Sequence, residues 1–312
     1  MYNRFSEGEK HVKIWIAAIA LCSLTGLVAA DDLEDSYTKL KDAVAKKDPD
    51  TVKASAAETL KLAQALVTAP KPTDADEVKD WQQRVDYGKE VSTYTEYALA
   101  FVAAQPGVDA AKTVDMVDTL IAQNPKSNYL DLCVAAYAAA LNKTGGSAKM
   151  LAGMTKVVTG RPDNTIALQA LVEGSGSSPD RALGYANKLI AAIKGKTKPE
   201  GVAEADWEKQ KNAALATGYF TAGYVYLQKQ AWVDCDKNMK AALPLLAGDQ
   251  ARLGTAYYGL GACNFQFGKM TNDRTKMQAG EKYTEQSAAI KSPVQDQAYR
   301  NVALMKQALA GK

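Results

Sequence analysis

The side chains that most often carry catalysis are scarce in this chain. Its 312 residues include a single histidine, His11, and four cysteines. His11 lies in a basic segment ahead of an apolar run, where we predict a leader that is removed. A mature chain without histidine can run neither a Ser-His-Asp nor a Cys-His mechanism, and it has no imidazole for a metal. Carboxylates alone can catalyse reactions, but no pair of acids stands out, so we expect a protein that is not an enzyme.

The cysteines leave two interpretations open. Cys22 would leave with the leader, and Cys133, Cys235 and Cys263 would remain. No CxxC pair occurs, so the sequence supports neither a zinc site nor a thioredoxin-like site. An odd number of cysteines leaves at least one thiol unpaired in an oxidising compartment. The three are either small buried side chains on helices, or Cys235 and Cys263 form a disulfide.

Segments that resemble ligand loops have simpler explanations. Gly174-Ser175-Gly176 lacks the preceding strand that a phosphate loop needs, so we interpret it as a linker. The acids between Asp74 and Asp80 stand at an expected helix start, where carboxylates favour the helix dipole, and their spacing is not that of a calcium loop. We therefore expect no cofactor and no metal.

The first 30 residues have the order of a secretory leader. Basic residues precede an uncharged run of 17 residues, Ile14 to Ala30, that ends Val-Ala-Ala. This pattern predicts cleavage after Ala30 and export, to the periplasm. One alternative is an uncleaved membrane anchor, for which 17 residues is at the short limit. Another is a lipoprotein through Cys22, although Leu21 stands where a small residue is expected.

The overall charge argues against nucleic acid as a partner. Lysine and arginine number 38, aspartate and glutamate 35, and the formal net charge is +3. A nucleic-acid-binding domain has a concentrated excess of basic residues. We expect no such partner here.

The elements that must position any site are helices. Apolar residues recur at helical spacing almost throughout, as in Leu33, Tyr37, Leu40 and Val44, and sustained strand alternation is missing. Asp48-Pro49, Gln105-Pro106-Gly107 and Gly145-Gly146 are typical of helix boundaries. The sequence predicts an all-α fold without a β-sheet. The expected helices are 32–47, 49–68, 74–104, 108–123, 127–142, 147–159, 164–173, 179–194 and 200–229, then three more and a last one at 294–310.

One stretch of the chain resembles the tetratricopeptide repeat. Ala216 is taken as position 1 of the repeat. The family's small positions 8, 20 and 27 are then Gly223, Cys235 and Ala242. Its large positions 11, 17 and 24 are Tyr226, Trp232 and Met239. A second unit starts at Gly254, and its second helix, with Ala279 and Tyr283 at the 20/24 spacing, follows an insertion at 270–277. The resemblance covers 216–291 and, more loosely, 97–194.

The resemblance implies a right-handed α-solenoid of antiparallel helix pairs. It divides the chain into a leader at 1–30, N-terminal helices at 31–105, degenerate helical repeats at 106–195, and repeats with a C-terminal capping helix at 200–312. Such arrays are usually scaffolds that hold a protein or peptide in a concave groove.

The family's groove positions define the expected site. They lie on the first helix of each pair, and here the binding residues would be Phe220, Tyr224, Gln228, Tyr258, Phe265 and Gln266. Aromatic and amide side chains suit an extended peptide. The lysine and asparagine of the carboxylate-clamp subgroup are missing, so we expect no clamp for chaperone tails. Two alternatives stay open: the same groove binds a small molecule or glycan, or these rings pack against 200–215 or 294–310.

Overall fold

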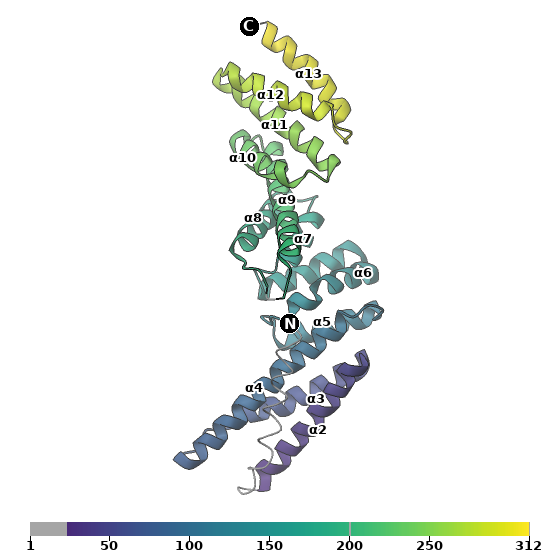
Figure 1. Cartoon of the computed structure of the whole chain (residues 1–312), viewed down its shortest axis with the longest axis vertical. Coiled ribbons are helices and arrows are strands. Elements are labelled where there is room, and N and C mark those ends of the chain that lie inside the picture. The colour runs from purple at the N-terminus through teal and green to yellow at the C-terminus, as the bar shows by residue number, and fades with distance from the viewer. Residues whose placement is uncertain (1–23, 200, 312) are drawn as a thin grey trace. The chain divides into compact units, whose positions relative to one another are not determined.

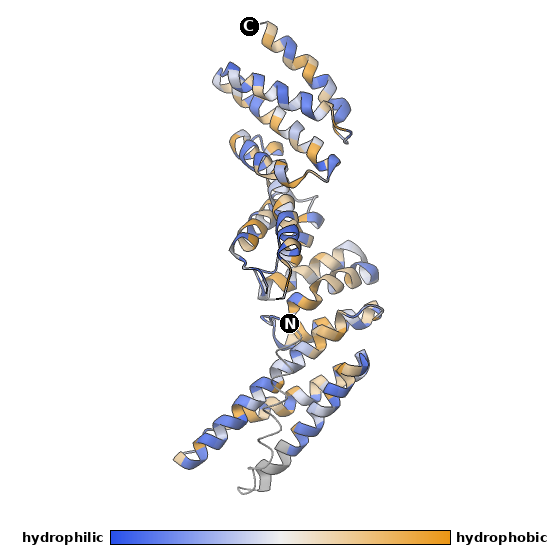
Figure 2. Ribbon diagram, viewed as in Figure 1, coloured by the Kyte–Doolittle hydropathy of each residue, from blue (hydrophilic) through white to orange (hydrophobic). Residues whose placement is uncertain are grey.

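The described part of the chain is all-α. The computed structural model describes residues 24–199 and 201–311, with side chains from Asp31 onward. This part contains twelve α-helices, one short 3₁₀-helix and no strand (Figure 1). Figure 2 shows apolar and polar residues on the same ribbons, as expected of helices that bury one face. The predicted all-α fold class is confirmed.

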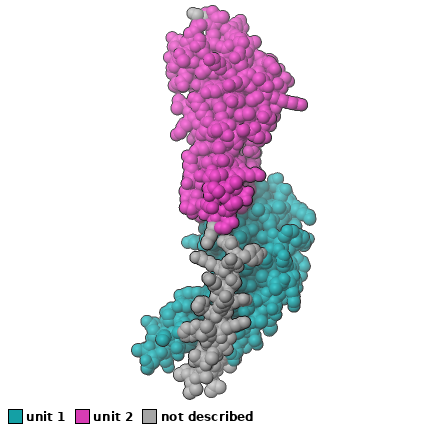
Figure 3. Space-filling view, viewed as in Figure 1, with its two compact units in different colours: residues 1–161 teal, residues 162–312 magenta. Residues whose placement is uncertain are grey.

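Backbone packing divides the chain into two compact units, residues 1–161 and residues 162–312 (Figure 3). The first unit contains five of the described helices. They are α2 (Leu24–Lys46), α3 (Pro49–Val67), α4 (Ala75–Ala103), α5 (Ala110–Gln123) and α6 (Leu130–Gly160). Each packs on the next, and α2 also contacts α4, α3 contacts α5, and α4 contacts α6.

The helix α6 is bent inside. Gly146 has φ 69° and ψ −172°, which is not a helical conformation. Glycine adopts a positive φ without the steric cost that a Cβ atom brings. The break predicted at Gly145-Gly146 between 127–142 and 147–159 is therefore present as a kink.

The second unit contains seven α-helices. They are α7 (Thr165–Gly174), α8 (Pro179–Gly195), α9 (Glu204–Gln228), α10 (Trp232–Ala242), α11 (Gln250–Thr271), α12 (Arg274–Ala288) and α13 (Gln295–Ala310), with the 3₁₀-helix η1 (Leu243–Leu245) after α10. Successive helices pack on each other, and α7 also contacts α9, α9 contacts α11, and α11 contacts α13.

The predicted internal boundaries do not separate the units. A division at 105/106 falls between α4 and α5, and one at 195/200 falls between α8 and α9. Both pairs pack together within one unit. The structure instead divides the chain between Arg161 and Pro162.

Short polar caps start many of the helices. The Asp48 side chain accepts a hydrogen bond from the Asp50 backbone N–H at 3.2 Å, with Pro49 at the first helical position. Such a cap satisfies a backbone donor that the helix itself leaves free. Ser178 directly precedes Pro179 at the start of α8 but makes no side-chain capping bond. Side chains cap α4, α5, α7, α11 and α12 through Asp74, Asp109, Asn164, Asp249 and Asp273.

Glycines set the closest helix crossings of the second unit. A Cβ atom at Gly223 of α9 would lie 2.8 Å from Met239 Cγ of α10, as the predicted packing role requires. Met239 also reaches Gly259 of α11, whose Cβ would lie 3.0 Å from its Cε. The Met239 side chain is fully buried. It therefore fills the space between α9 and α11.

The crossing of α11 and α12 is tighter. A Cβ atom at Gly280 would lie 2.6 Å from the backbone nitrogen of Phe265 and 2.8 Å from the carbonyl oxygen of Gly261. The repeat pattern placed the small residue of this crossing at Ala279. The structure gives it to Gly280, one residue further on.

The insertion at 270–277 forms no long loop. The helix α11 runs on to Thr271, and α12 begins at Arg274. Asn272 has the left-handed φ of 58°, and the Asp273 side chain caps α12. Asparagine tolerates the left-handed region better than most residues. The extra residues therefore lengthen the two helices.

The predicted leader lies mostly outside the described residues, which begin at 24. Its expected cleavage site after Ala30 falls within α2, and Leu33 is the first side chain of α2 described as buried. In the described segments, none of the helices combines the length and apolar character needed to cross a membrane.

We expect Gly280→Ala to lower the free energy of unfolding by about 1–3 kcal/mol, because the added methyl meets backbone atoms that cannot move aside. Gly184→Ala is the matched control in the same unit. Gly184 lies inside α8 with no atom within 4 Å of its Cβ position, so alanine there should stabilise by about 0.5–1 kcal/mol. Urea unfolding of both variants measures the difference, and equal effects would contradict the close crossing.

The buried thiol of Cys133 in α6 predicts a loss of stability at alkaline pH. Burial raises the pKa of this thiol from 9.0 to about 12. The buried, protonated thiol makes its full contribution to the free energy of unfolding below pH 9. This contribution is lost as pH rises from 9 toward 12, because the thiol of the unfolded chain releases its proton at a lower pH than the thiol of the folded chain. At about pH 10.5 the loss is about 2 kcal/mol. Urea unfolding at pH 8 and at about pH 10.5 measures this loss. The free energy of unfolding should fall less between the two pH values for Cys133→Ala than for the wild type, and equal falls would contradict the prediction.

Candidate functional site

Three of the predicted binding residues form one stripe along α9. Phe220, Tyr224 and Gln228 are spaced by four residues, which places them above one another on a helix. The rings of Phe220 and Tyr224 are stacked, with centroids 6.4 Å apart and planes 16° apart. Tyr224 is 42% exposed, Gln228 is exposed and Phe220 is half-buried. We call these three residues the α9 stripe.

The first turn of α11 adds a cation to the stripe. The Arg252 guanidinium carbon lies 5.9 Å from the centre of the Phe220 ring, within the range of a cation–π contact. Arg252 Nη1 also donates to Thr217 Oγ1 at 3.4 Å, and Nε lies 3.4 Å from a carboxylate oxygen of Asp249. Arg252 is not one of the residues predicted from the repeat positions. Its contact depends on how α11 packs on α9, and sequence spacing gives no signal for that.

The predicted residues on α11 belong to a second group. Tyr258 is half-buried, and its hydroxyl accepts a hydrogen bond from Asn301 Nδ2 of α13 at 3.1 Å. Gln266 is exposed two turns further along. Among the described residues, no ring contact or hydrogen bond joins Tyr258 to the α9 stripe. Tyr258 is thus held by the C-terminal helix, as one of the open alternatives proposed.

Phe265 does not lie on a binding surface. It is only 6% exposed and packs with Met277, Met305 and Leu309. Residues 258, 262 and 266 follow one stripe of α11, and a residue directly before 266 is turned by about 100° from it. That rotation points Phe265 into the core formed with α12 and α13.

The first unit contains an aromatic row that the sequence analysis did not propose as a site. Ring centroids lie 5.1 Å apart for Tyr37 and Tyr94, 5.7 Å for Tyr94 and Tyr97, and 5.4 Å for Tyr97 and Phe101. Tyr129, just before α6, lies 5.7 Å from Tyr97. All five rings are half-buried. The spacing 94, 97, 101 is visible in the sequence, but there it indicates only an apolar helix side.

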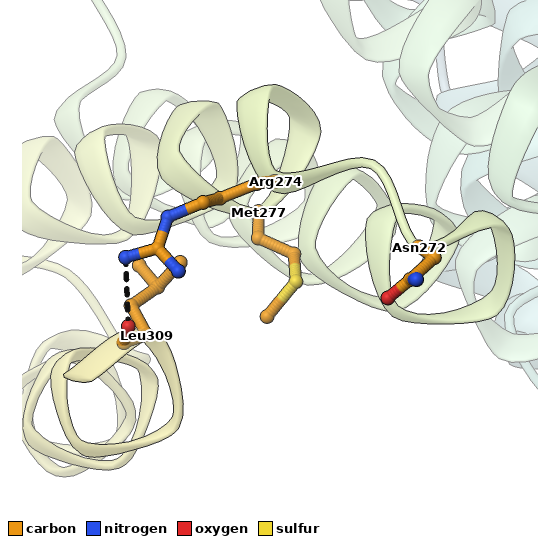
Figure 4. Close-up of a pocket in the computed structure, with 4 residues that line it drawn as sticks. All are labelled: Asn272, Arg274, Met277 and Leu309. Atoms are coloured by element: carbon orange, nitrogen blue, oxygen red, sulfur yellow. Dashed lines mark hydrogen bonds between the residues drawn. The ribbon is translucent and has the colours of Figure 1, made fainter. Parts of the chain in front are cut away.

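One pocket lies elsewhere in the second unit. It has a volume of about 360 Å³ and is lined by Asn272, Arg274, Met277 and Leu309 (Figure 4). The Arg274 guanidinium donates to the carbonyl oxygen of Leu309 at 2.9 Å and so caps the end of α13. Of its described lining residues, Arg274 is the charged one, and it is engaged in this contact.

A smaller pocket of about 210 Å³ lies at the turn between α3 and α4. The Trp81 indole donates to the backbone oxygen of Ala69 at 2.9 Å, which fixes the turn. The lining is Leu66, Ala69, Pro70, Pro72, Glu77, Trp81 and Arg84.

Two tyrosines of the first unit have strongly raised pKa values because of burial and because they donate to carboxylates. Burial, then a hydrogen bond to Glu34, raises the pKa of Tyr87, whose hydroxyl donates to Glu34 at 2.5 Å. Burial, then a hydrogen bond to Asp118, does the same for Tyr137. Within the described chain, no group of three or more His, Cys, Asp or Glu side chains could hold a metal ion.

The α9 stripe with Arg252 is the best-supported candidate surface. It combines an exposed ring, an exposed amide and a cation from a neighbouring helix. Comparisons with protein-family models, with curated proteins and with solved structures find no match to this chain.

Proposed function

We propose that this chain is an exported, non-enzymatic helical-repeat scaffold that binds a protein or peptide through the α9 stripe. The observation that carries the proposal is the Phe220–Tyr224 stack. The Phe220 ring is fixed by Arg252, and the Tyr224 ring above it stays 42% exposed. A large, rigid aromatic surface of this kind contributes contact area at a low entropic cost.

The contacts between helices support an α-solenoid for each unit, and its right-handedness is what the repeat resemblance implies. Within each unit, the described α-helices contact only α-helices one or two places away along the chain. Contacts limited to near neighbours are typical of repeat arrays, in which no unit buries its apolar face alone. In such an array α7, α9, α11 and α13 form one row, and this row carries the α9 stripe.

The form of the surface favours a peptide over a small molecule or glycan. Small ligands need a concave site that surrounds most of their surface. The two pockets described above are lined by residues of other regions. An extended segment can instead lie along α9, with an apolar side chain on Tyr224 and a backbone carbonyl near Gln228. The exported location follows from the leader-like sequence, so the partner would be an envelope or secreted protein.

The test compares two exposed tyrosines of the full chain. A photo-crosslinking amino acid at position 224 should capture a defined partner in an envelope extract, and the same group at position 299 should not. Tyr299 is 58% exposed on α13, and it is turned by roughly 200° from Asn301, the residue that contacts Tyr258. Both probe positions are therefore exposed, but position 224 lies in the α9 stripe and position 299 lies on α13.

Binding of the captured partner's peptide is then measured. Tyr224→Ser should weaken it at least about 10-fold, since aromatic anchors dominate such interfaces, and Tyr299→Ser should leave it unchanged. Equal capture at both positions, or capture at neither, would contradict the proposal. A glycan or metabolite that raises Tm in the wild type but not in Tyr224→Ser would favour the alternative ligand.

A further inference from the structure

Two cysteine sulfurs meet in the core of the second unit. The Sγ atoms of Cys235 in α10 and Cys263 in α11 are 2.7 Å apart, and both side chains are fully buried. Each sulfur also contacts the carbonyl oxygen of Gly259, at 3.8 and 2.7 Å. A disulfide bond is about 2.05 Å long, so only a small movement separates this pair from a bond.

We propose that Cys235 and Cys263 are the site of an oxidative modification, in which a disulfide-bearing oxidant links them covalently. The proposal stands apart from the identity of any binding partner. It rests on the distance between the sulfurs, their burial and, within the described part of the chain, the lack of another cysteine beside them. Cys133, the other described cysteine, belongs to the first unit and hydrogen-bonds the backbone oxygens of Tyr129 and Leu130.

The reaction balances by thiol–disulfide exchange. One protein thiolate attacks the oxidant's disulfide, which forms a mixed disulfide and releases one thiolate of the oxidant. The second protein thiolate then attacks the mixed disulfide at the protein sulfur and releases the other half. Two thiol protons leave the protein, two electrons reduce the oxidant, and one Sγ–Sγ bond forms.

The folded core controls when this happens. The hydrogen bond with Cys263, and then burial, raise the pKa of Cys235, so the thiolate is disfavoured once α10 and α11 are packed. The oxidant also needs access to a sulfur that the folded chain covers. The bond therefore forms while the chain folds, before the two helices close over the pair.

The bond would join α10 to α11 across 28 residues of sequence. A cross-link restricts the unfolded chain, and the restriction grows with the length of the loop that it closes. It also secures the contact in which Met239 of α10 packs against Gly259 of α11. The expected effect is greater resistance of the second unit to unfolding.

The experiment refolds the full chain from denaturant with oxidised and reduced glutathione as the redox probe. Of four cysteines, two should remain titratable under denaturing conditions, and a nonreducing digest should contain a peptide pair joined at Cys235 and Cys263. Reduction with dithiothreitol should lower Tm by roughly 5–15 °C.

Two variants make the result decisive. Cys133→Ala should keep the linked pair and the Tm response to reduction, whereas Cys263→Ala should lose both. Four titratable thiols after oxidative refolding, or a bond mapped to another pair, would overturn the proposal. An unchanged Tm on reduction of a mapped 235–263 bond would overturn the stabilising role.

Discussion

The close crossing of helices at glycines is the constraint on which the second unit depends. At Gly280 and Gly261 the backbones of α11 and α12 approach so closely that a methyl group would meet main-chain atoms. At Gly223 and Gly259 one side chain, Met239, fills the space between α9 and α11. Arg252 of α11 contacts the ring of Phe220 on α9, so the candidate surface is formed by these same two helices.

Local chemistry explains why most of the helices could be predicted from sequence. Asp48-Pro49 starts α3 through a side-chain cap and a fixed φ, and Gly146 bends α6 through a positive φ. Each signal acts within a few residues, so no knowledge of the fold was needed. The turn at Asn272-Asp273 was harder to predict from sequence. A turn of two residues can connect α11 and α12 only because both helices are longer than the repeat pattern indicates.

The site could be predicted only in part, because it depends on neighbours distant in sequence. The four-residue spacing of the α9 stripe is a local property, and the expected grouping of Phe220 with Tyr224 is present as a ring stack. Burial of Phe265 depends on where α13 packs, and the contact of Arg252 depends on the crossing of α9 with α11. The aromatic row of the first unit joins rings from α2, from α4 and from the turn before α6, so helical periodicity cannot reveal it.

The cysteine pair and the α9 stripe are linked through the same helix. The helix α10 packs on both α9 and α11. It presents Met239 to glycines of both neighbours, and the Cys235 sulfur meets Cys263 of α11. A covalent bond between α10 and α11 would fix the contact between these two helices. The contact between α9 and α10 would still depend on packing. Since Phe220 and Tyr224 lie on α9, the bond would limit the opening of the core without tying down the proposed binding helix. Stability and adaptability of the surface can therefore be set by different contacts of α10.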